Sequence, residues 1–166
     1  FHTTLAMHAH SRLCIVGDGP KLSALRTLAE ELCIRDKVDF LGQRLDVLDL
    51  MAASDAFIIS SENEGLPMSL LEAMSVSLPV IVTEVGEMPA VVEDGVSGYL
   101  VTPRSPSCLA SVMSRVVSEP TISRDVGANA KSTNEKLFSV QQAVNLYEDI
   151  YAEAMSLKSY SRVVIS

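Results

Sequence analysis

Two glutamates that stand eight residues apart, Glu64 and Glu72, are the side chains of this sequence best suited to chemistry. Glu64 follows a short apolar run and precedes Gly65, so we expect it on a loop. Glu72 lies among helix-forming residues that begin after Pro67. Carboxylates accept hydrogen bonds from ligand hydroxyls, which is how acidic residues commonly hold ribose and sugars. The pair therefore indicates a site for a hydroxyl-rich ligand.

The place of Glu72 on its helix leaves a second interpretation open. The apolar stripe of this helix is formed by Leu70, Leu71, Ala73 and Met74, and Glu72 falls on roughly the opposite side of the helical wheel. A solvated glutamate on an exposed helix face has the same spacing. The spacing alone does not decide between a ligand-binding residue and a surface residue.

A glycine-containing loop at residues 17–20 (GDGP) is a weaker candidate for ligand binding. Glycine lets a backbone approach a ligand closely, and a helix N-terminus presents free N–H groups to an anion. Leu22 stands where the third glycine of a G-x-G-x-x-G fingerprint would be. Asp18 and Pro20 are also typical of an ordinary turn from a strand into a helix. Both a nucleotide-proximal loop and a plain turn stay open.

Short apolar runs that alternate with amphipathic stretches predict the fold. We expect strands at residues 12–17, 37–42, 55–60, 79–83 and 98–101. We expect helices at residues 21–34, 46–53, 68–76, 107–118 and 139–157, with a turn-rich piece from Pro120 onward. This alternation predicts an α/β fold with a Rossmann-like, doubly wound parallel sheet and helices on both faces. Ligands of such sheets bind beyond the carboxyl ends of the strands.

The composition excludes several classes of function. The 13 basic and 21 acidic side chains give a net charge of −8, which argues against a nucleic-acid partner because phosphate binding needs a basic face. No apolar run approaches the ~18 residues of a membrane-spanning helix. We interpret Cys14, Cys33 and Cys108 as small buried hydrophobic residues of a reducing compartment, and we expect no metal site.

Residues 60–83 (SSENEGLPMSLLEAMSVSLPVIVT) resemble the E-x7-E signature of retaining glycosyltransferases with the GT-B fold, in particular the family 4 type. IVGDGP, KVDFLG, PVIVTEVG and VVEDGVSGYLVTP also follow in the family's order and approximate spacing, so that the resemblance covers about residues 4–155. It implies that residues 1–157 form the C-terminal, nucleotide-sugar-binding domain, with a tail at residues 158–166.

The resemblance also implies roles for individual residues. Glu64 is similar to the catalytic-site glutamate that contacts the donor sugar, and Glu72 to the one that holds the ribose hydroxyls. No metal ion or cofactor is expected. The expected substrate is a nucleotide sugar, with uridine as the first candidate nucleoside and guanosine and adenosine as alternatives. The residues expected to bind the nucleotide sugar are Gly17, Gly19, Gly42, Glu64, Gly65, Leu66 and Glu72.

The sequence departs from the family's pattern at several places. The family's diphosphate-binding Arg and Lys, and the strand before them, have no counterpart. Glu87 stands where a glycine is usual, which brings a carboxylate close to the expected phosphate position. With strand order 3-2-1-4-5-6, the missing first strand would open the sheet between residues 12–17 and 55–60. Residues 162–166 (RVVIS) are β-branched enough to fill that place, although we expect a frayed terminus there.

The resemblance implies a retaining hexosyltransferase of polysaccharide biosynthesis, which moves a sugar from a nucleotide diphosphate to a glycan or lipid-linked acceptor. Without the N-terminal Rossmann-like domain that binds the acceptor, the chain would be inactive. A non-catalytic nucleotide-sugar-binding module and a GT-B sugar-nucleotide epimerase are the alternatives. The expected localisation is cytoplasmic, and any peripheral association with the inner face of a membrane would belong to the full-length enzyme.

Overall fold

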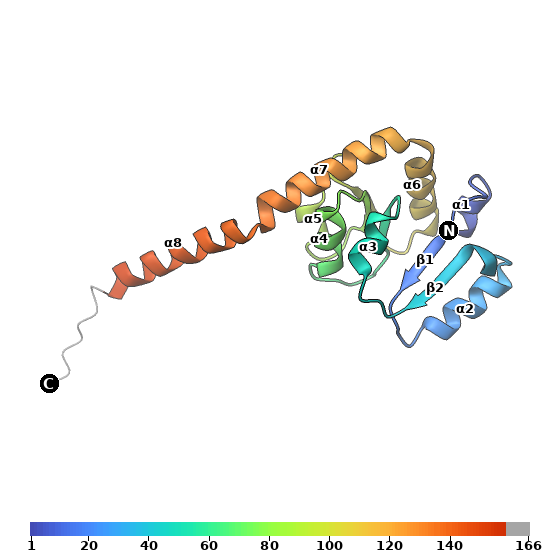
Figure 1. Ribbon diagram of the computed structural model, residues 1–166, viewed down its shortest axis with the longest axis horizontal. Helices are drawn as coiled ribbons and strands as arrows, with labels where there is room; N and C mark the ends of the chain where they lie inside the picture. The colour runs from blue at the N-terminus through green and yellow to red at the C-terminus, as the bar shows by residue number, and fades with distance from the viewer. Residues whose placement is uncertain (159–166) are drawn as a thin grey trace.

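The computed structural model of the chain describes residues 1–158, and it contains the expected alternation of strands and helices (Figure 1). Each expected strand is confirmed: β1 (Leu13–Val16), β2 (Val38–Gly42), β3 (Phe57–Ile59), β4 (Val80–Thr83) and β5 (Tyr99–Val101). The helices are α1 (His2–Leu5), α2 (Leu22–Glu31), the 3-10 turn η1 (Arg35–Lys37), α3 (Val47–Ala52), α4 (Met68–Ser75), α5 (Met88–Val91), α6 (Pro106–Ser118), α7 (Pro120–Phe138) and α8 (Val140–Lys158).

The strands form two parallel sheets, β1–β2 and β3–β4–β5. Within the described residues, β1 and β3 each have a second edge without a paired strand. The expected opening between these two strands is therefore present, and the order of the others agrees with the doubly wound arrangement. The segment 162–166, whose β-branched sequence could fill this opening, lies outside the described residues.

Strand β4 runs through the centre of the core, and all four of its residues are buried. Leu70, Ala73 and Met74 of α4 belong to the hydrophobic cluster on one face of the sheet, together with Val80 and Val82. The cluster on the other face contains Ile81, Tyr99, Val101, Met113, Val116 and Val126. Helices therefore cover both faces of β4, which gives α4 and the loops at the carboxyl end of β4 a rigid support.

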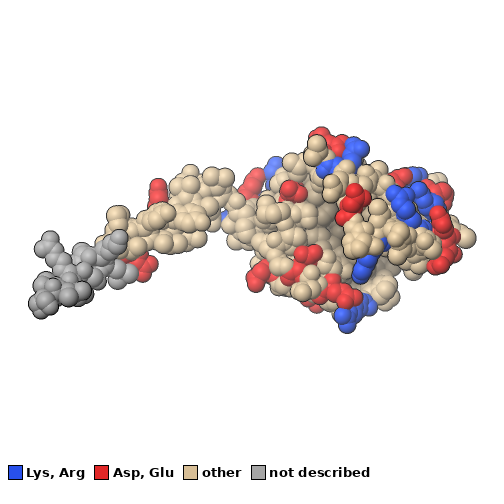
Figure 2. Space-filling model, turned by 90° about the horizontal axis from the view of Figure 1, so that it is seen from below, with Lys and Arg blue, Asp and Glu red and all other residues tan. Residues whose placement is uncertain are grey.

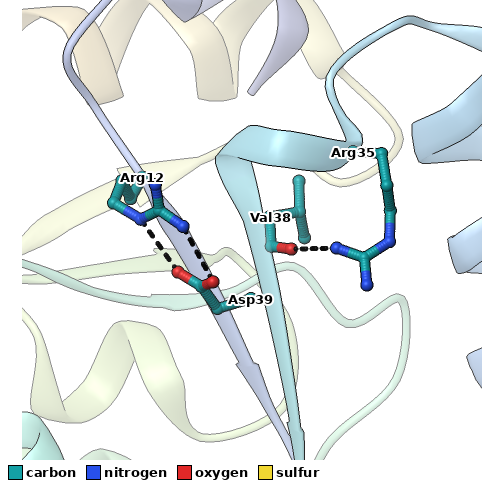
Figure 3. A network of polar contacts seen from close by, with 4 residues as sticks. All are labelled: Arg12, Arg35, Val38 and Asp39. Atoms are coloured by element: carbon teal, nitrogen blue, oxygen red, sulfur yellow. Dashed lines mark hydrogen bonds and ion pairs between the residues drawn. The ribbon is translucent and has the colours of Figure 1, made fainter.

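The β1–β2 sheet is less buried than the β3–β4–β5 sheet. Arg12 donates two hydrogen bonds to the Asp39 carboxylate, at 3.0 and 2.8 Å, and thereby joins β1 to β2 (Figure 3). Arg35 donates a 3.0 Å hydrogen bond to the carbonyl of Val38.

The prediction that the cysteines are buried is wrong for Cys14 and Cys33, which are exposed, and Cys108 is half-buried.

The physical reasons for the two exposed cysteines differ. Cys14 lies on the face of β1 that no described element covers, between residues whose exposure alternates along the strand. Cys33 follows the end of α2 and adopts a left-handed backbone with φ of +54°, which turns the chain away from the helix. Among the described residues, no group of three or more His, Cys, Asp or Glu side chains could hold a metal ion.

The prediction of a turn-rich piece after Pro120 is wrong, because these residues form the 19-residue helix α7. Its sequence is rich in small and polar residues with modest helix propensity, but tertiary packing overrides that propensity. A Cβ at Gly127 would overlap the carbonyl oxygen of Ser77, so that only glycine allows this close approach to the loop after α4. Val126 and Ala130 are buried beside it.

Helix α8 extends away from the rest of the chain (Figure 1). Its side chains from residue 140 to residue 156 are exposed, and Ser139 separates it from α7 with an extended backbone.

None of the helices described here has the length and apolar character needed to cross a membrane. On the face drawn in Figure 2, acidic and basic side chains are interspersed over the sheet-containing part.

Candidate functional site

The loops that follow β1 and β2 are joined to each other at two of the predicted glycines. The N–H of Gly17 donates a 2.7 Å hydrogen bond to the carbonyl of Gly42. Both residues have positive φ angles, +112° and +63°, which side-chain-bearing residues rarely adopt. The third predicted glycine, Gly19, is exposed, and its carbonyl accepts the N–H of Leu22 in the turn into α2.

A cavity of about 460 Å³ opens at these two loops. This volume lies within the usual range for small-molecule sites, roughly 300–1,000 Å³. Apolar walls and a few polar groups meet there, as in many ligand sites. The residues that line the cavity are Val16, Gly17, Gln43, Arg44, Leu45 and Val47.

The orientation of the Arg44 guanidinium at this cavity is fixed by two hydrogen bonds to Asp46. Arg44 donates from Nε to Oδ1 at 2.8 Å and from Nη2 to Oδ2 at 2.6 Å. The hydrogen bonds from Arg44 hold the pKa of Asp46 below its ordinary value, which favours the ionised carboxylate and strengthens the pair. A planar guanidinium fixed in this way can stack on a flat aromatic ligand.

Glu64 is positioned from the end of β4 through Ser61. The buried Thr83 donates from Oγ1 to the carbonyl of Ser61 at 2.6 Å, and Ser61 donates from Oγ to Oε1 of Glu64 at 2.9 Å. Glu64 itself is half-buried. Its carboxylate is therefore oriented by the sheet and still has acceptor capacity for a ligand hydroxyl.

The loop after β4 packs directly on the loop that carries Glu64. A Cβ at Gly86 would overlap the carbonyl oxygen of Glu64, and the N–H of Glu87 donates to the carbonyl of Gly65 at 3.2 Å. Leu66 is half-buried and packs against the hydrophobic cluster that contains Leu70 and Val80, which anchors this loop on the core. The exposed Glu87 is therefore an acidic residue next to Gly65 along this contact, which its backbone N–H makes.

Glu72 lies on α4 where the helical wheel predicts it. Leu70, Ala73 and Met74 are fully buried on the core side of the helix, and Glu72 is half-buried. Among the described residues, no hydrogen bond or ion pair engages its carboxylate. The structure thus joins Gly17 to Gly42 and Glu64 to the Gly86 loop, whereas the assignment of Glu72 to ribose stays a prediction.

A pair that the sequence did not single out, Glu62 and Arg104, links the loops after β3 and β5. Nη2 of Arg104 donates to Oε2 of Glu62 at 2.7 Å. This hydrogen bond and the arginine charge lower the pKa of Glu62. The only signal in the sequence is a basic residue in a loop at the carboxyl end of a strand, which is too common to be selected from the sequence.

Comparisons with a family model and with individual proteins lead to the same family. Residues 3–133 match the sequence model of the family described as Glycosyl transferases group 1. The chain is 33% identical over 145 residues to N-acetyl-alpha-D-glucosaminyl L-malate synthase of Bacillus anthracis, a match that covers 87% of this chain and 38% of that protein. It is 26% identical over 140 residues to the Escherichia coli UDP-Gal:alpha-D-GlcNAc-diphosphoundecaprenol alpha-1,3-galactosyltransferase, covering 84% of this chain and 36% of that protein.

Solved structures agree with these relatives. The Anabaena protein Alr3699/HepE in complex with UDP-glucose superposes with a TM-score of 0.78 and 28% sequence identity, over 93% of this chain and 44% of that one. The same protein in complex with UDP gives a TM-score of 0.79 and 27% identity. The chain thus spans about two fifths of the length of these proteins.

Proposed function

The chain belongs to the Glycosyl transferases group 1 family, and from this premise we propose that it binds the nucleotide-sugar donor of a glycosyltransferase with the GT-B fold. The observation that carries the proposal is the shared location of two preformed features. The 460 Å³ cavity at Gly17 and Arg44 and the oriented carboxylate of Glu64 both lie beyond the carboxyl ends of parallel strands, where doubly wound sheets bind ligands.

The proposed donor extends from this cavity toward Glu64. The flat guanidinium of Arg44 and the apolar Val16 and Val47 favour a nucleobase in the cavity. Glu64 accepts hydrogen bonds from the sugar, and Glu72 accepts them from the ribose hydroxyls. A uridine diphosphate sugar is our first candidate, because the named complexes of Alr3699/HepE contain UDP or UDP-glucose and the E. coli relative is a UDP-Gal galactosyltransferase.

In the proposed reaction, the bond between the sugar's anomeric carbon and the diphosphate oxygen breaks. A bond to a hydroxyl oxygen of a glycan or lipid-linked acceptor forms on the same face, and the acceptor's proton moves to the departing phosphate. The configuration is retained without a covalent intermediate on a carboxylate or a metal ion. A second, N-terminal Rossmann-like domain would supply the acceptor site, so that residues 1–158 alone would be inactive as a transferase.

One observation favours a second candidate, a nucleotide-sugar-binding module without catalysis. Glu87 donates its backbone N–H to the carbonyl of Gly65, so that an additional acidic residue stands next to the loop where we place the diphosphate. Full-length protein that binds the nucleotide sugar but transfers no sugar would favour this candidate. In either case we place the protein in the cytoplasm, with any peripheral membrane contact made outside this chain.

Calorimetric titration of the chain with UDP, GDP and ADP tests the donor site. We expect one nucleotide to bind, and Glu72→Ala to weaken its binding by ~1–3 kcal/mol, the contribution of a hydrogen bond to a charged group. Glu135→Ala, which removes an exposed glutamate of α7, is the matched control and should leave the affinity unchanged. Equal affinity of the wild type and Glu72→Ala would contradict the ribose assignment, and no binding of any of the three nucleotides would contradict the donor site.

A further inference from the structure

The loops at the carboxyl ends of the strands carry more carboxylates than cations. Residues 17–21, 42–46, 60–67, 84–88 and 102–105 carry six carboxylates and three basic side chains. Phosphates are bound by charge-assisted hydrogen bonds, most strongly from arginine. The three cations are Lys21, Arg44 and Arg104. Phosphate binding at this end of the sheet therefore depends on how many of their N–H groups are not already hydrogen-bonded to a carboxylate.

Two of these cations are arginines, and they differ in how fully a carboxylate engages them. Arg44 makes two hydrogen bonds to Asp46, which occupy one whole edge of its guanidinium. Arg104 makes a single hydrogen bond to Glu62, from Nη2 to Oε2. Its side chain is 76% exposed and that of Glu62 is 59% exposed, so its other N–H groups are open to a ligand.

The turn that carries Arg104 is held from both sides. Val101 at the end of β5 is buried, and Ser105 caps α6 by accepting the N–H of Cys108 at 3.4 Å. Between them, Arg104 has a left-handed backbone with φ of +57°, which is uncommon for a residue with a side chain. This conformation directs Arg104 to Glu62, two residues before Glu64 and on the same loop. The guanidinium is thus tied to the loop that carries Glu64, the residue that we assign to the donor sugar.

We propose that Arg104 binds the diphosphate of the nucleotide-sugar donor, and that Glu62 holds its guanidinium beside the site until a phosphate takes the carboxylate's place. This inference rests on the proposed function. A phosphate oxygen pair can accept two parallel N–H bonds, whereas Glu62 accepts one from Arg104. A glutamate is ionised near neutral pH, and the hydrogen bond from Arg104 lowers the pKa of Glu62 further, so the exchange is between two anions.

Calorimetric titrations with UDP and with uridine separate this role from a structural one. We expect Arg104→Gln to weaken UDP binding about tenfold, since a charged hydrogen bond contributes roughly that factor, and to leave uridine binding unchanged. Arg12→Gln is the matched control, because Arg12 also pairs with an exposed carboxylate but lies at the amino end of β1. It should change neither affinity. Wild-type UDP affinity in Arg104→Gln, or an equal loss of uridine and UDP affinity, would overturn the inference.

Glu62→Gln tests the exchange itself. Removal of the competing carboxylate should strengthen UDP binding about two- to fivefold, and the gain should be smaller when Arg104 is also replaced by Gln, because part of it acts through the guanidinium. A Glu62→Gln variant that loses UDP affinity would overturn the exchange, because Glu62 would then support the bound state and not compete with the phosphate. If the wild-type chain binds none of UDP, GDP and ADP, the proposed function fails. If the wild-type chain binds UDP and Arg104→Gln binds it equally well, only the role of Arg104 fails.

Discussion

Gly86 faces the carbonyl oxygen of Glu64 so closely that a Cβ on Gly86 would overlap it. The loop after β4 thereby fixes the backbone of the residue that we assign to the donor sugar. The contact joins segments that are 22 residues apart and that leave two neighbouring strands, β3 and β4. The geometry of Glu64 thus depends on a glycine that has no chemistry of its own.

Gly86→Ala should destabilise the chain and displace Glu64. The substitution combines a left-handed backbone, φ +56°, with overlap against rigid main-chain atoms of Glu64 and Gly65. Overpacking of this kind costs about 1–3 kcal/mol, and the left-handed conformation costs a further ~1 kcal/mol. Denaturant unfolding followed by circular dichroism measures the loss.

The control for this substitution is Gly95→Ala. Gly95 also has a left-handed backbone, with φ of +72°, but no described atom lies within 4 Å of the position that a Cβ would take. It reports the cost of the backbone conformation alone. Equal losses of stability for Gly86→Ala and Gly95→Ala would show that the contact between Gly86 and Glu64 has no energetic weight.

Ser61→Ala should lower the affinity for a nucleotide sugar more than the affinity for the nucleotide. Ser61 donates to Oε1 of Glu64, and without this bond the carboxylate is free to rotate away from the sugar. We expect UDP-glucose binding to weaken by ~0.5–1.5 kcal/mol, the net contribution of one hydrogen bond, and UDP binding to stay unchanged. Calorimetry with both ligands measures the difference, and an equal effect on both would contradict the positioning role.

The sequence was a good guide to the sheet because each strand has a local signal. Apolar runs bounded by Gly, Pro or polar residues predicted all five strands. The stripe of Leu70, Leu71, Ala73 and Met74 predicted the core side of α4, where Leu71 is half-buried and the other three are buried. Helix α7 was missed because its signal is not local. Gly127 lowers the helix propensity of this segment and is required only by the close packing on the loop at Ser77.

The site was predictable in part for the same reason. Gly17, Gly42, Glu64 and Gly65 lie on loops that strand ends identify from the sequence. The ion pair between Arg104 and Glu62 joins residues 42 positions apart, and nothing near either residue indicates the other. Contacts of this kind follow from the order of the strands in the sheet, which the residue pattern alone does not specify.

The stability contributed by Asp39 should depend on pH. The hydrogen bond from Arg12 holds the pKa of Asp39 below its ordinary value of 3.8. Because the folded-state pKa lies below the unfolded one, the contribution is present above pH ~4 and is lost as the pH falls through the lowered value. Asp39→Asn should therefore unfold at a slightly lower temperature than the wild type at pH 7, and the difference should vanish in acid.

Thermal unfolding of both proteins between pH 7 and pH 2 measures this dependence. Asp55→Asn is the matched control, because Asp55 is exposed and no hydrogen bond or ion pair is described for its side chain. Its unfolding temperature should follow that of the wild type at every pH. A difference between Asp39→Asn and the wild type that persists at pH 2 would mean that Asp39 stabilises the chain by some means other than its charge.

Deletion of α8 should leave the stability of the rest of the chain nearly unchanged. The side chains of residues 140–156 are exposed, including Tyr147 at 60% and Tyr151 at 65%, and within the described residues α8 packs mainly on α7. A chain that ends at Ser139 should keep its free energy of unfolding within about 0.5 kcal/mol, as for other surface changes. Leu70→Ala in the core should cost ~2–5 kcal/mol by comparison. Denaturant unfolding measures both, and a deletion as costly as Leu70→Ala would show that α8 packs against the sheet-containing part in solution.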